Sequence, residues 1–218
     1  MLKVQSFVFN DFQENTYLIW DQTNQCAIID PGCFRATERK QLSDFIRENG
    51  LKPSLLLNTH CHIDHVLGND YVMNAFQLPL HLHKDEISTY ENTKKWTAMF
   101  GIPPLEVPEN LVFLEPGTSV SFGSTQLEIL FTPGHSIASV SFLHRPSLQL
   151  FAGDVLFKQS IGRTDLPGGN LQTLLKSIQE NILVLPDETR VYAGHMEPTT
   201  VGEERTNNPY LRNLAASL

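Results

Sequence analysis

The sequence of 218 residues contains no long apolar run, and no stretch approaches the eighteen or so apolar residues that a membrane-spanning helix needs. It also lacks low-complexity segments and internal repeats, so we expect neither disorder nor a repeat architecture. Basic residues are few: 16 Lys and Arg stand against 24 Asp and Glu, for a formal net charge of −8. The largest basic groups are the pairs Arg39-Lys40 and Lys94-Lys95. These absences argue against a membrane or a nucleic acid as partner and leave the oligomeric state open.

Cysteine is scarce as well. Cys26, Cys33 and Cys61 cannot all pair within one chain, and their spacing contains no CxxC metal motif, so a reducing compartment fits best. The N-terminus leads directly into strand-like alternation, without the apolar segment of a signal peptide. A chain of this length buries about 70% of its unfolded surface on folding, so it needs no disulfide bonds or structural metals for stability. We therefore expect a cytoplasmic protein with a single domain over residues 1–218.

One short stretch carries most of the chemistry. His60, His62, Asp64 and His65 follow the apolar run at 54–58, which is typical of a short buried strand. Imidazole and carboxylate groups are the usual ligands of zinc and neighbouring divalent metals. Since His60 and His62 are two residues apart, they could share one face of an extended segment, whereas Asp64 and His65 point differently and suit a second ion. The spacing therefore indicates a site for two metals.

Single histidines are more often structural residues than ligands, so the surrounding pattern matters. Five of the eight histidines follow a strand-like run and precede Gly, Pro or a helix signal: His60, His62, His65, His135 and His195. His81 and His83 alternate with leucines and could resemble a ligand pair, but no carboxylate or third histidine is near them in sequence. We interpret these two as residues of a half-exposed edge strand.

In the rest of the sequence, the pattern of apolar residues alternates between that of strands and that of helices. Strand-like runs end at 9, 20 and 30, helical spacing follows around Leu42, and a second group of strands begins at Leu111. Asn170 is a plausible N-cap, and Thr200 with Glu203 suits a capping box. Sheet, helix, sheet and helix, with candidate ligands at strand ends, predict an α/β fold: a four-layer αββα sandwich with the site along the edge between its two sheets.

Together with Gly134-His135, Gly153-Asp154 and Gly194-His195, the stretch His60-x-His62-x-Asp64-His65 resembles the metallo-β-lactamase-fold hydrolases, and most closely the short forms of their glyoxalase II-like branch. The resemblance implies a first metal held by His60, His62 and His135. It implies a second metal held by Asp64, His65 and His195, with Asp154 bridging the two. The implied cofactors are two divalent ions, with zinc preferred over iron or manganese. Cys61 becomes a spacer that faces away.

The resemblance also implies an activity. The chain is expected to be a dinuclear metal-dependent hydrolase that cleaves a small-molecule thioester, such as S-lactoylglutathione, by attack of a metal-bridging hydroxide. Asp64 and Asp154 would be its catalytic carboxylates. Two alternatives remain open: a lactonase or esterase of the same fold, and a persulfide dioxygenase, which holds one iron through the positions of His60, His135 and Asp154.

Substrate recognition is less well defined by the sequence. The segment around Arg163 resembles a loop of small glyoxalase II-like proteins, where Arg163 would lie near the substrate's carboxylate; alternatively, Arg163 and Asp165 hold a turn together. Full-length glyoxalase II enzymes carry a helical extension with cationic contacts to glutathione. After His195 the only basic residues here are Arg205 and Arg212, so we expect a raised KM for S-lactoylglutathione.

Overall fold

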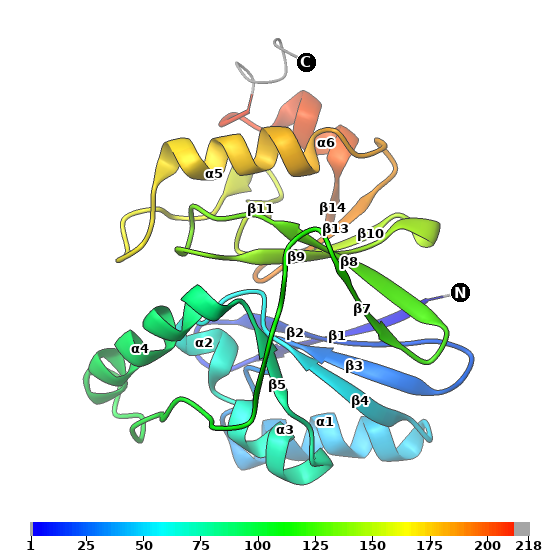
Figure 1. Cartoon of the computed structure of the whole chain (residues 1–218), viewed down its shortest axis with the longest axis vertical. Coiled ribbons are helices and arrows are strands. Elements are labelled where there is room, and N and C mark those ends of the chain that lie inside the picture. Colours follow the sequence, from blue (N-terminus) through cyan, green and yellow to red (C-terminus); the bar gives the residue numbers. More distant parts are fainter. Residues whose placement is uncertain (1, 212–218) are drawn as a thin grey trace.

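The computed structural model describes residues 2–211, apart from the side chain of Lys94; Arg212 therefore lies outside the described residues. Two sheets pack face to face and helices cover both outer faces, which confirms the predicted four-layer sandwich (Figure 1). Across residues 2–211, no helix is long and apolar enough to cross a membrane.

The first sheet is formed by the N-terminal half of the chain. Its strands lie in sequence order: β1 (Lys3–Phe9), β2 (Glu14–Trp20), β3 (Gln25–Ile29), β4 (Lys52–Leu57), β5 (Leu80–Leu82) and β6 (Leu111–Phe113). The first three strands are antiparallel, and β3 to β6 are parallel. Helices α1 (Ala36–Glu48) and α3 (Asn69–Phe76) cover its outer face, and α1 buries Leu42 and Ile46 there.

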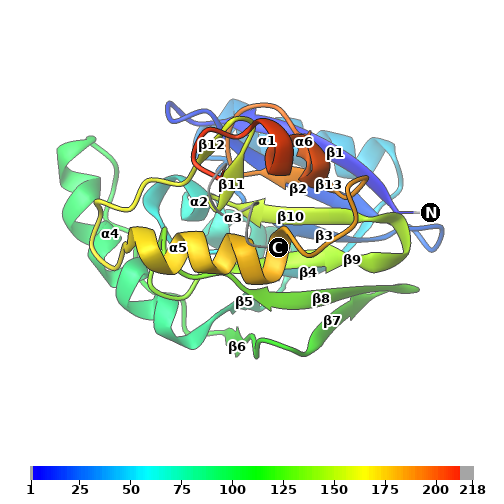
Figure 2. The same ribbon diagram turned by 90° about the horizontal axis from the view of Figure 1, so that it is seen from above.

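The second sheet comes from the C-terminal half. Its order is β14 (Thr199–Thr200), β13 (Arg190–Ala193), β10 (Gln149–Gly153), β9 (Val140–His144), β8 (Thr125–Phe131) and β7 (Ser119–Phe122). Helix α5 (Leu171–Ser177), extended by a π-helical turn over Ile178–Ile182, lies across the outer face together with α6 (Val201–Asn207) (Figure 2). The predicted N-cap is present, since the Asn170 side chain accepts from Thr173 N–H. The Thr200 hydroxyl accepts from Glu203 N–H, which is one of the two hydrogen bonds of the predicted capping box.

The alternation of side chains along the strands creates three apolar layers. On β4, Leu56 packs toward α1 and α3, whereas Leu55 and Leu57 pack between the two sheets. Such a strand is buried on both faces, which explains its continuous apolar sequence. A third cluster, with Leu150 and Leu174 among its members, fills the space between the second sheet and α5. This packing fixes the ends of β4, β10 and β13 relative to one another.

Strand direction brings the candidate ligands together. Because β10 and β13 are parallel, their carboxyl ends meet at one edge, directly before Asp154 and His195. Asn15 N–H donates to Gly194 O at 2.7 Å, so the end of β13 is hydrogen-bonded to the first sheet. The ends of strands from both halves therefore converge on one edge of the sandwich, where the sequence placed the site.

Some features differ from the sequence-based expectations. Strand β5 lies between β4 and β6 rather than at an edge, and His81 is buried with Nδ1 3.1 Å from Leu56 O. The alternation of histidine and leucine suggested one exposed face, but both faces of β5 are covered in the structure. Short elements were also missed: α2 (Ile63–Val66) and the hairpin of β11 (Leu156–Phe157) and β12 (Ser160–Ile161).

Candidate metal centre

Three histidines form the first group of potential ligands. His60 and His62 extend from the segment after β4, and His135 lies in the turn between β8 and β9; their ligand atoms lie within 4.8 Å of one another. His62 Nδ1 and His135 Nε2 are 2.8 Å apart. Burial, reinforced by neighbouring histidines, holds the pKa of His60 well below its usual value and lowers the pKa of His62 to about 3. Both rings are therefore neutral and offer lone pairs to a cation.

A second group lies beside the first. Asp64 and His65 are carried by α2, and His195 follows β13; their ligand atoms also lie within 4.8 Å of one another. His195 Nε2 is 3.1 Å from Asp64 Oδ2, and His65 Nε2 is 3.7 Å from the same oxygen. Burial alone would lower the pKa of His65, but the carboxylates of Asp64 and Asp154 outweigh it and raise the pKa well above its usual value. The two carboxylates thus favour a positive charge at this point, which a bound cation would supply.

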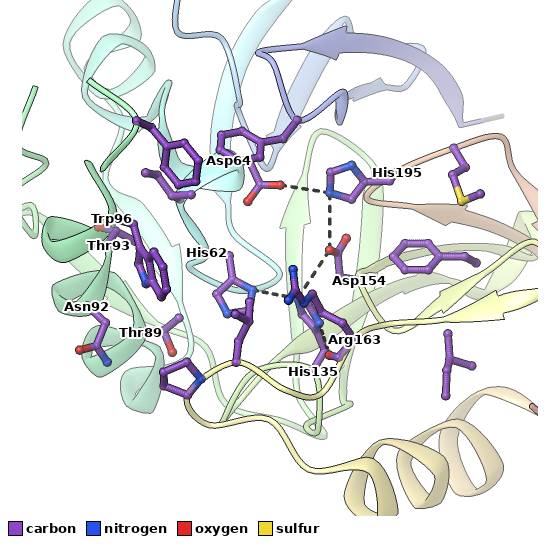
Figure 3. A pocket seen from close by; sticks show the side chains of 18 of the residues that line it. His62, Asp64, Thr89, Asn92, Thr93, Trp96, His135, Asp154, Arg163 and His195 are labelled. Atoms are coloured by element: carbon purple, nitrogen blue, oxygen red, sulfur yellow. Dashed lines mark hydrogen bonds and ion pairs between the residues drawn. The ribbon is translucent and has the colours of Figure 1, made fainter. Parts of the chain in front are cut away.

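Asp154 lies between the two groups. Its Oδ1 is 3.4 Å from His65 Nε2. Its Oδ2 is 3.5 Å from both His135 Nε2 and His195 Nε2 (Figure 3). Burial would raise the pKa of Asp154, but the surrounding histidines, His65 foremost, hold it well below its usual range. One ionised carboxylate therefore faces both groups.

The donor atoms meet the chemical requirements of a metal centre. His60 Nε2 is a buried polar atom without a hydrogen-bond partner, and His65 Nε2 and Asp154 Oδ1 form no hydrogen bond but an ion pair of 3.4 Å with each other. Leaving a buried atom such as His60 Nε2 unpaired costs about 1–3 kcal/mol, so its position among other potential ligands requires an explanation. Nitrogen and carboxylate oxygen donors suit zinc, and they also suit iron. The residues present therefore fit a pair of divalent ions.

Neighbouring groups fix the orientation of the rings. His135 Nδ1 is 2.8 Å from Arg163 O, and His195 Nδ1 is 3.2 Å from Gln13 O. A carbonyl can only accept, so each Nδ1 carries the proton and each Nε2 turns its lone pair inward. His65 Nδ1 lies 3.1 Å from Asp30 Oδ2 and is held in the same way. Such outer contacts typically orient metal-binding histidines.

Asp30 is a supporting residue that the sequence did not reveal. Its carboxylate accepts from Thr59 N–H at 2.7 Å and from the Thr59 hydroxyl at 2.6 Å, besides contacting His65. Asp30 also groups with His60 and His65 as a potential ligand set, but its oxygens are occupied by these contacts. We assign it to orienting the loop after β4. The only sequence signal was the break Asp30-Pro31-Gly32 after a strand.

Glu86 was also missed. It is fully buried at the start of α4 (Ile87–Met99), and its carboxylate accepts from Cys61 N–H, Ser136 Oγ–H and Ala138 N–H at 2.9, 2.6 and 2.9 Å. It thereby joins the loop of His60 and His62 to the loop of His135. A glutamate near the start of a predicted helix carries no sequence signal for such a role.

The other candidates from the sequence lie elsewhere. Cys61 is buried and belongs to no potential ligand group among residues 2–211, and burial raises its pKa well above the usual value. His81 and His83 likewise belong to none of the groups found in the described part of the chain. Arg163 does line the cavity beside the centre, but its guanidinium forms two hydrogen bonds of 2.8 Å to Asp165. Its contact with substrate remains a prediction.

A cavity of about 610 Å³ opens directly onto the centre. His62, Asp64, His135, Asp154 and His195 contribute to its floor, and side chains from α4 and from the β11–β12 hairpin form its walls (Figure 3). This volume is in the usual range for small-molecule sites. The site therefore combines clustered donor atoms with room for a substrate.

Comparison with known proteins agrees with this geometry. A probable metallo-hydrolase of Bacillus subtilis is 38% identical over 93% of this chain and 94% of its own length. A hydroxyacylglutathione hydrolase of Haemophilus influenzae is 36% identical over the same shares. The solved structure of TTHA1623 in a di-iron-bound form has a TM-score of 0.85 and 36% identity, covering 95% of this chain and 100% of that one. The model of the metallo-β-lactamase superfamily matches residues 9–195, and the chain belongs to this superfamily.

Proposed function

We propose that the protein is a dinuclear metal-dependent hydrolase that cleaves a thioester of the S-lactoylglutathione type. The observation that carries this proposal is the position of Asp154 between the two ligand groups, within 3.5 Å of Nε2 atoms of both. When bound, a pair of divalent ions would polarise a carbonyl and make a water molecule nucleophilic near neutral pH. Zinc is the preferred metal; iron and manganese remain alternatives, and iron is the metal in the TTHA1623 structure.

The six residues of the two ligand groups, together with Asp154, have distinct roles in this proposal. His60, His62 and His135 hold the first ion, and Asp64, His65 and His195 hold the second. Asp154 places a negative charge between them and offsets the repulsion of two cations. These assignments are supported by the unpartnered His60 Nε2 and by the ion pair of Asp154 with His65 described above.

Asp64 and Asp154 are the proposed catalytic carboxylates. Burial alone would raise the pKa of Asp64, but His65 and His195 outweigh it and lower the pKa. An ionised Asp64 can accept the proton that the attacking water releases and pass it to the departing thiolate. Asp154 lines the same cavity and stays ionised beside the reacting carbonyl, where it orients the water by accepting a hydrogen bond.

Relatives support a hydrolase more firmly than they support one substrate. The Haemophilus influenzae relative is a hydroxyacylglutathione hydrolase, whereas the Bacillus subtilis relative carries only a general metallo-hydrolase description. Thioester cleavage is therefore our proposal, with a lactone or other ester as the neighbouring substrate class. We place the protein in the cytoplasm, because Cys26, Cys33 and Cys61 are all unpaired, as expected for a reducing compartment.

Metal analysis combined with two assays tests this proposal. Protein purified without added metal should contain about two divalent ions per chain and should hydrolyse S-lactoylglutathione or a simple lactoyl thioester. About one iron per chain, with oxygen uptake on glutathione persulfide and no thioester cleavage, would instead establish the persulfide dioxygenase. His81→Ala provides the control, since His81 lies outside the ligand groups and should retain both metal and turnover.

A further inference from the structure

The cavity wall formed by α4 and the residue after it combines aromatic side chains with three polar ones, Thr89, Asn92 and Thr93. Trp96 and Phe100 line it, and Phe12, from the turn between β1 and β2, lies against Phe100 with ring centroids 5.1 Å apart at 81°. Figure 3 shows Trp96, Thr93 and Thr89 along one side of the cavity, facing His62. Phe100 is 52% exposed, so part of this aromatic ring is available to an apolar group bound in the cavity.

The opposite wall is mainly apolar. Phe157 and Ile161, from the β11–β12 hairpin, line it with Leu166 and Met196. The Phe157 ring lies 6.3 Å from that of His195, so apolar surface reaches the metal centre itself. Met196 is 63% exposed and adds a second apolar side chain at the opening.

The described lining offers little to an anionic substrate. Arg163 is the one Lys or Arg among the lining side chains that the structure describes, and Asp165 already binds its guanidinium through two hydrogen bonds. Arg205, named from the sequence as a remaining cation, is on α6 and contacts Asp187 and the carbonyls of Leu183 and Leu185. A carboxylate placed against Trp96, Phe100 or the hairpin wall would lose hydration without gaining a charged partner.

We propose that the cavity takes a thioester or ester whose acyl group is uncharged and apolar, an alkyl or aryl chain packed against Phe12, Trp96 and Phe100. This inference rests on the proposed function for the reacting group and adds the chemistry of the acyl group. It follows from the aromatic wall, the apolar hairpin opposite and the paired state of Arg163. The leaving thiol then adds little to substrate binding, and the carboxylates of a glutathione leaving group contribute little affinity.

A series of N-acetylcysteamine thioesters measures the preference directly. From acetyl to butyryl to hexanoyl, kcat/KM should rise roughly threefold to fourfold per added methylene, the effect of burying that group. The succinyl ester, which matches butyryl in chain length but carries a carboxylate, should be cleaved at least tenfold less efficiently than butyryl. A series that does not respond to length, or one in which succinyl is preferred, would overturn the proposal.

Two variants locate the effect on the α4 wall. Trp96→Ala should lower the ratio of hexanoyl to acetyl kcat/KM by about fivefold to tenfold, because the chain loses its aromatic contact. Val184→Ala is the control: Val184 is also an exposed apolar residue, with 60% of its surface accessible, and lies outside this cavity, so the ratio should not change. Equal ratios in all three proteins would contradict the assignment of this wall.

Binding of compounds that cannot be hydrolysed tests the apolar acyl site independently of the proposed hydrolase function. The thioethers S-ethyl- and S-hexyl-N-acetylcysteamine lack the reacting carbonyl, and calorimetry should show the hexyl compound binding at least tenfold more tightly to the wild type. That result, together with no hydrolysis of any thioester, would overturn the proposed function and retain the apolar site. Equal binding of both thioethers by a protein that does hydrolyse thioesters would overturn the apolar site and retain the function.

Discussion

Glu86 and Cys61 are joined by a hydrogen bond of 2.9 Å from the Cys61 amide to Glu86 Oε2, inside a fully buried pocket behind the metal centre. The other carboxylate oxygen accepts from Ser136 and Ala138, next to His135. A single side chain thus sets the distance between the two loops that carry the first ligand group. Its chemistry is specific, because both oxygens accept from backbone amides.

Glu86→Gln should therefore weaken metal binding at the first group. The amide NH₂ of glutamine would face either the Cys61 or the Ala138 N–H, so one loop would shift. Loss of such an outer contact typically costs 10–100-fold in metal affinity. Chelator competition on the purified variant measures it, with the exposed Glu91→Gln on α4 as control. Unchanged affinity in Glu86→Gln would show that the loops hold their positions without this carboxylate.

Gly194 makes a second, steric prediction. A Cβ added there would lie 2.1 Å from Asp154 Oδ1 and 2.7 Å from His65 Cε1. Gly194→Ala should displace the Asp154 carboxylate, release at least one metal ion and reduce turnover at least a hundredfold. Gly50→Ala is the comparison: its backbone has φ +61° with no atom within 4 Å of the added Cβ, so it should lose about 1 kcal/mol of stability and keep its metal. Full metal content in Gly194→Ala would contradict the bridging position of Asp154.

The sequence predicted the candidate ligands more completely than the residues that support them. Strand ends, ligand spacing and the family resemblance predicted seven ligands, and the structure brings six of them into two groups with Asp154 between the groups. Asp30 and Glu86 were missed because their partners are 29 and 52 residues away, at Thr59 and Ala138, and only tertiary packing brings them together. The sequence also did not predict the apolar lining of the cavity, because Phe12, Trp96 and Phe157 come from three separate segments.

Asp21 gives a prediction for pH-dependent stability. It accepts hydrogen bonds from Thr23 N–H at 2.8 Å and Ser124 N–H at 2.6 Å, joining a turn of the first sheet to one of the second. Burial alone would raise the pKa of Asp21, but these hydrogen bonds outweigh it and hold the pKa below its usual range. A lowered folded-state pKa stabilises the protein above the unfolded pKa of about 4, and this contribution is lost as the pH falls through the folded value.

Asp21→Asn should accordingly reduce the free energy of unfolding by about 2 kcal/mol at pH 7. The difference from wild type should shrink as the pH falls from about 4 toward the lowered folded pKa, because the unfolded wild type then binds a proton that the folded carboxylate does not. Urea unfolding of both metal-free proteins across this pH range tests it. A difference that stays constant, or grows, toward acidic pH would show that the charge of Asp21 does not stabilise the fold.

Substitution of Asp165 tests whether its ion pair keeps Arg163 from contacting the substrate. Asp165→Asn should free the guanidinium, whose side chain is 61% exposed at the cavity, to contact an anionic substrate. The KM for S-lactoylglutathione should fall by about threefold to tenfold, a modest change because an exposed ion pair is weak. Steady-state kinetics should show no such fall in the double variant Asp165→Asn/Arg163→Ala. If that double variant improved equally, Arg163 would not be the group that contacts the carboxylate.

The metal content of Asp154→Ala, compared with wild type and His81→Ala, tests the central claim most directly. Asp154 lies within 3.5 Å of Nε2 atoms in both ligand groups, whereas His81 is equally buried but lies outside them. Elemental analysis after dialysis should give about two divalent ions per chain for wild type and His81→Ala, and one or none for Asp154→Ala. Two retained ions with wild-type thioester turnover in Asp154→Ala would contradict the assignment of Asp154 as the bridge of a dinuclear centre.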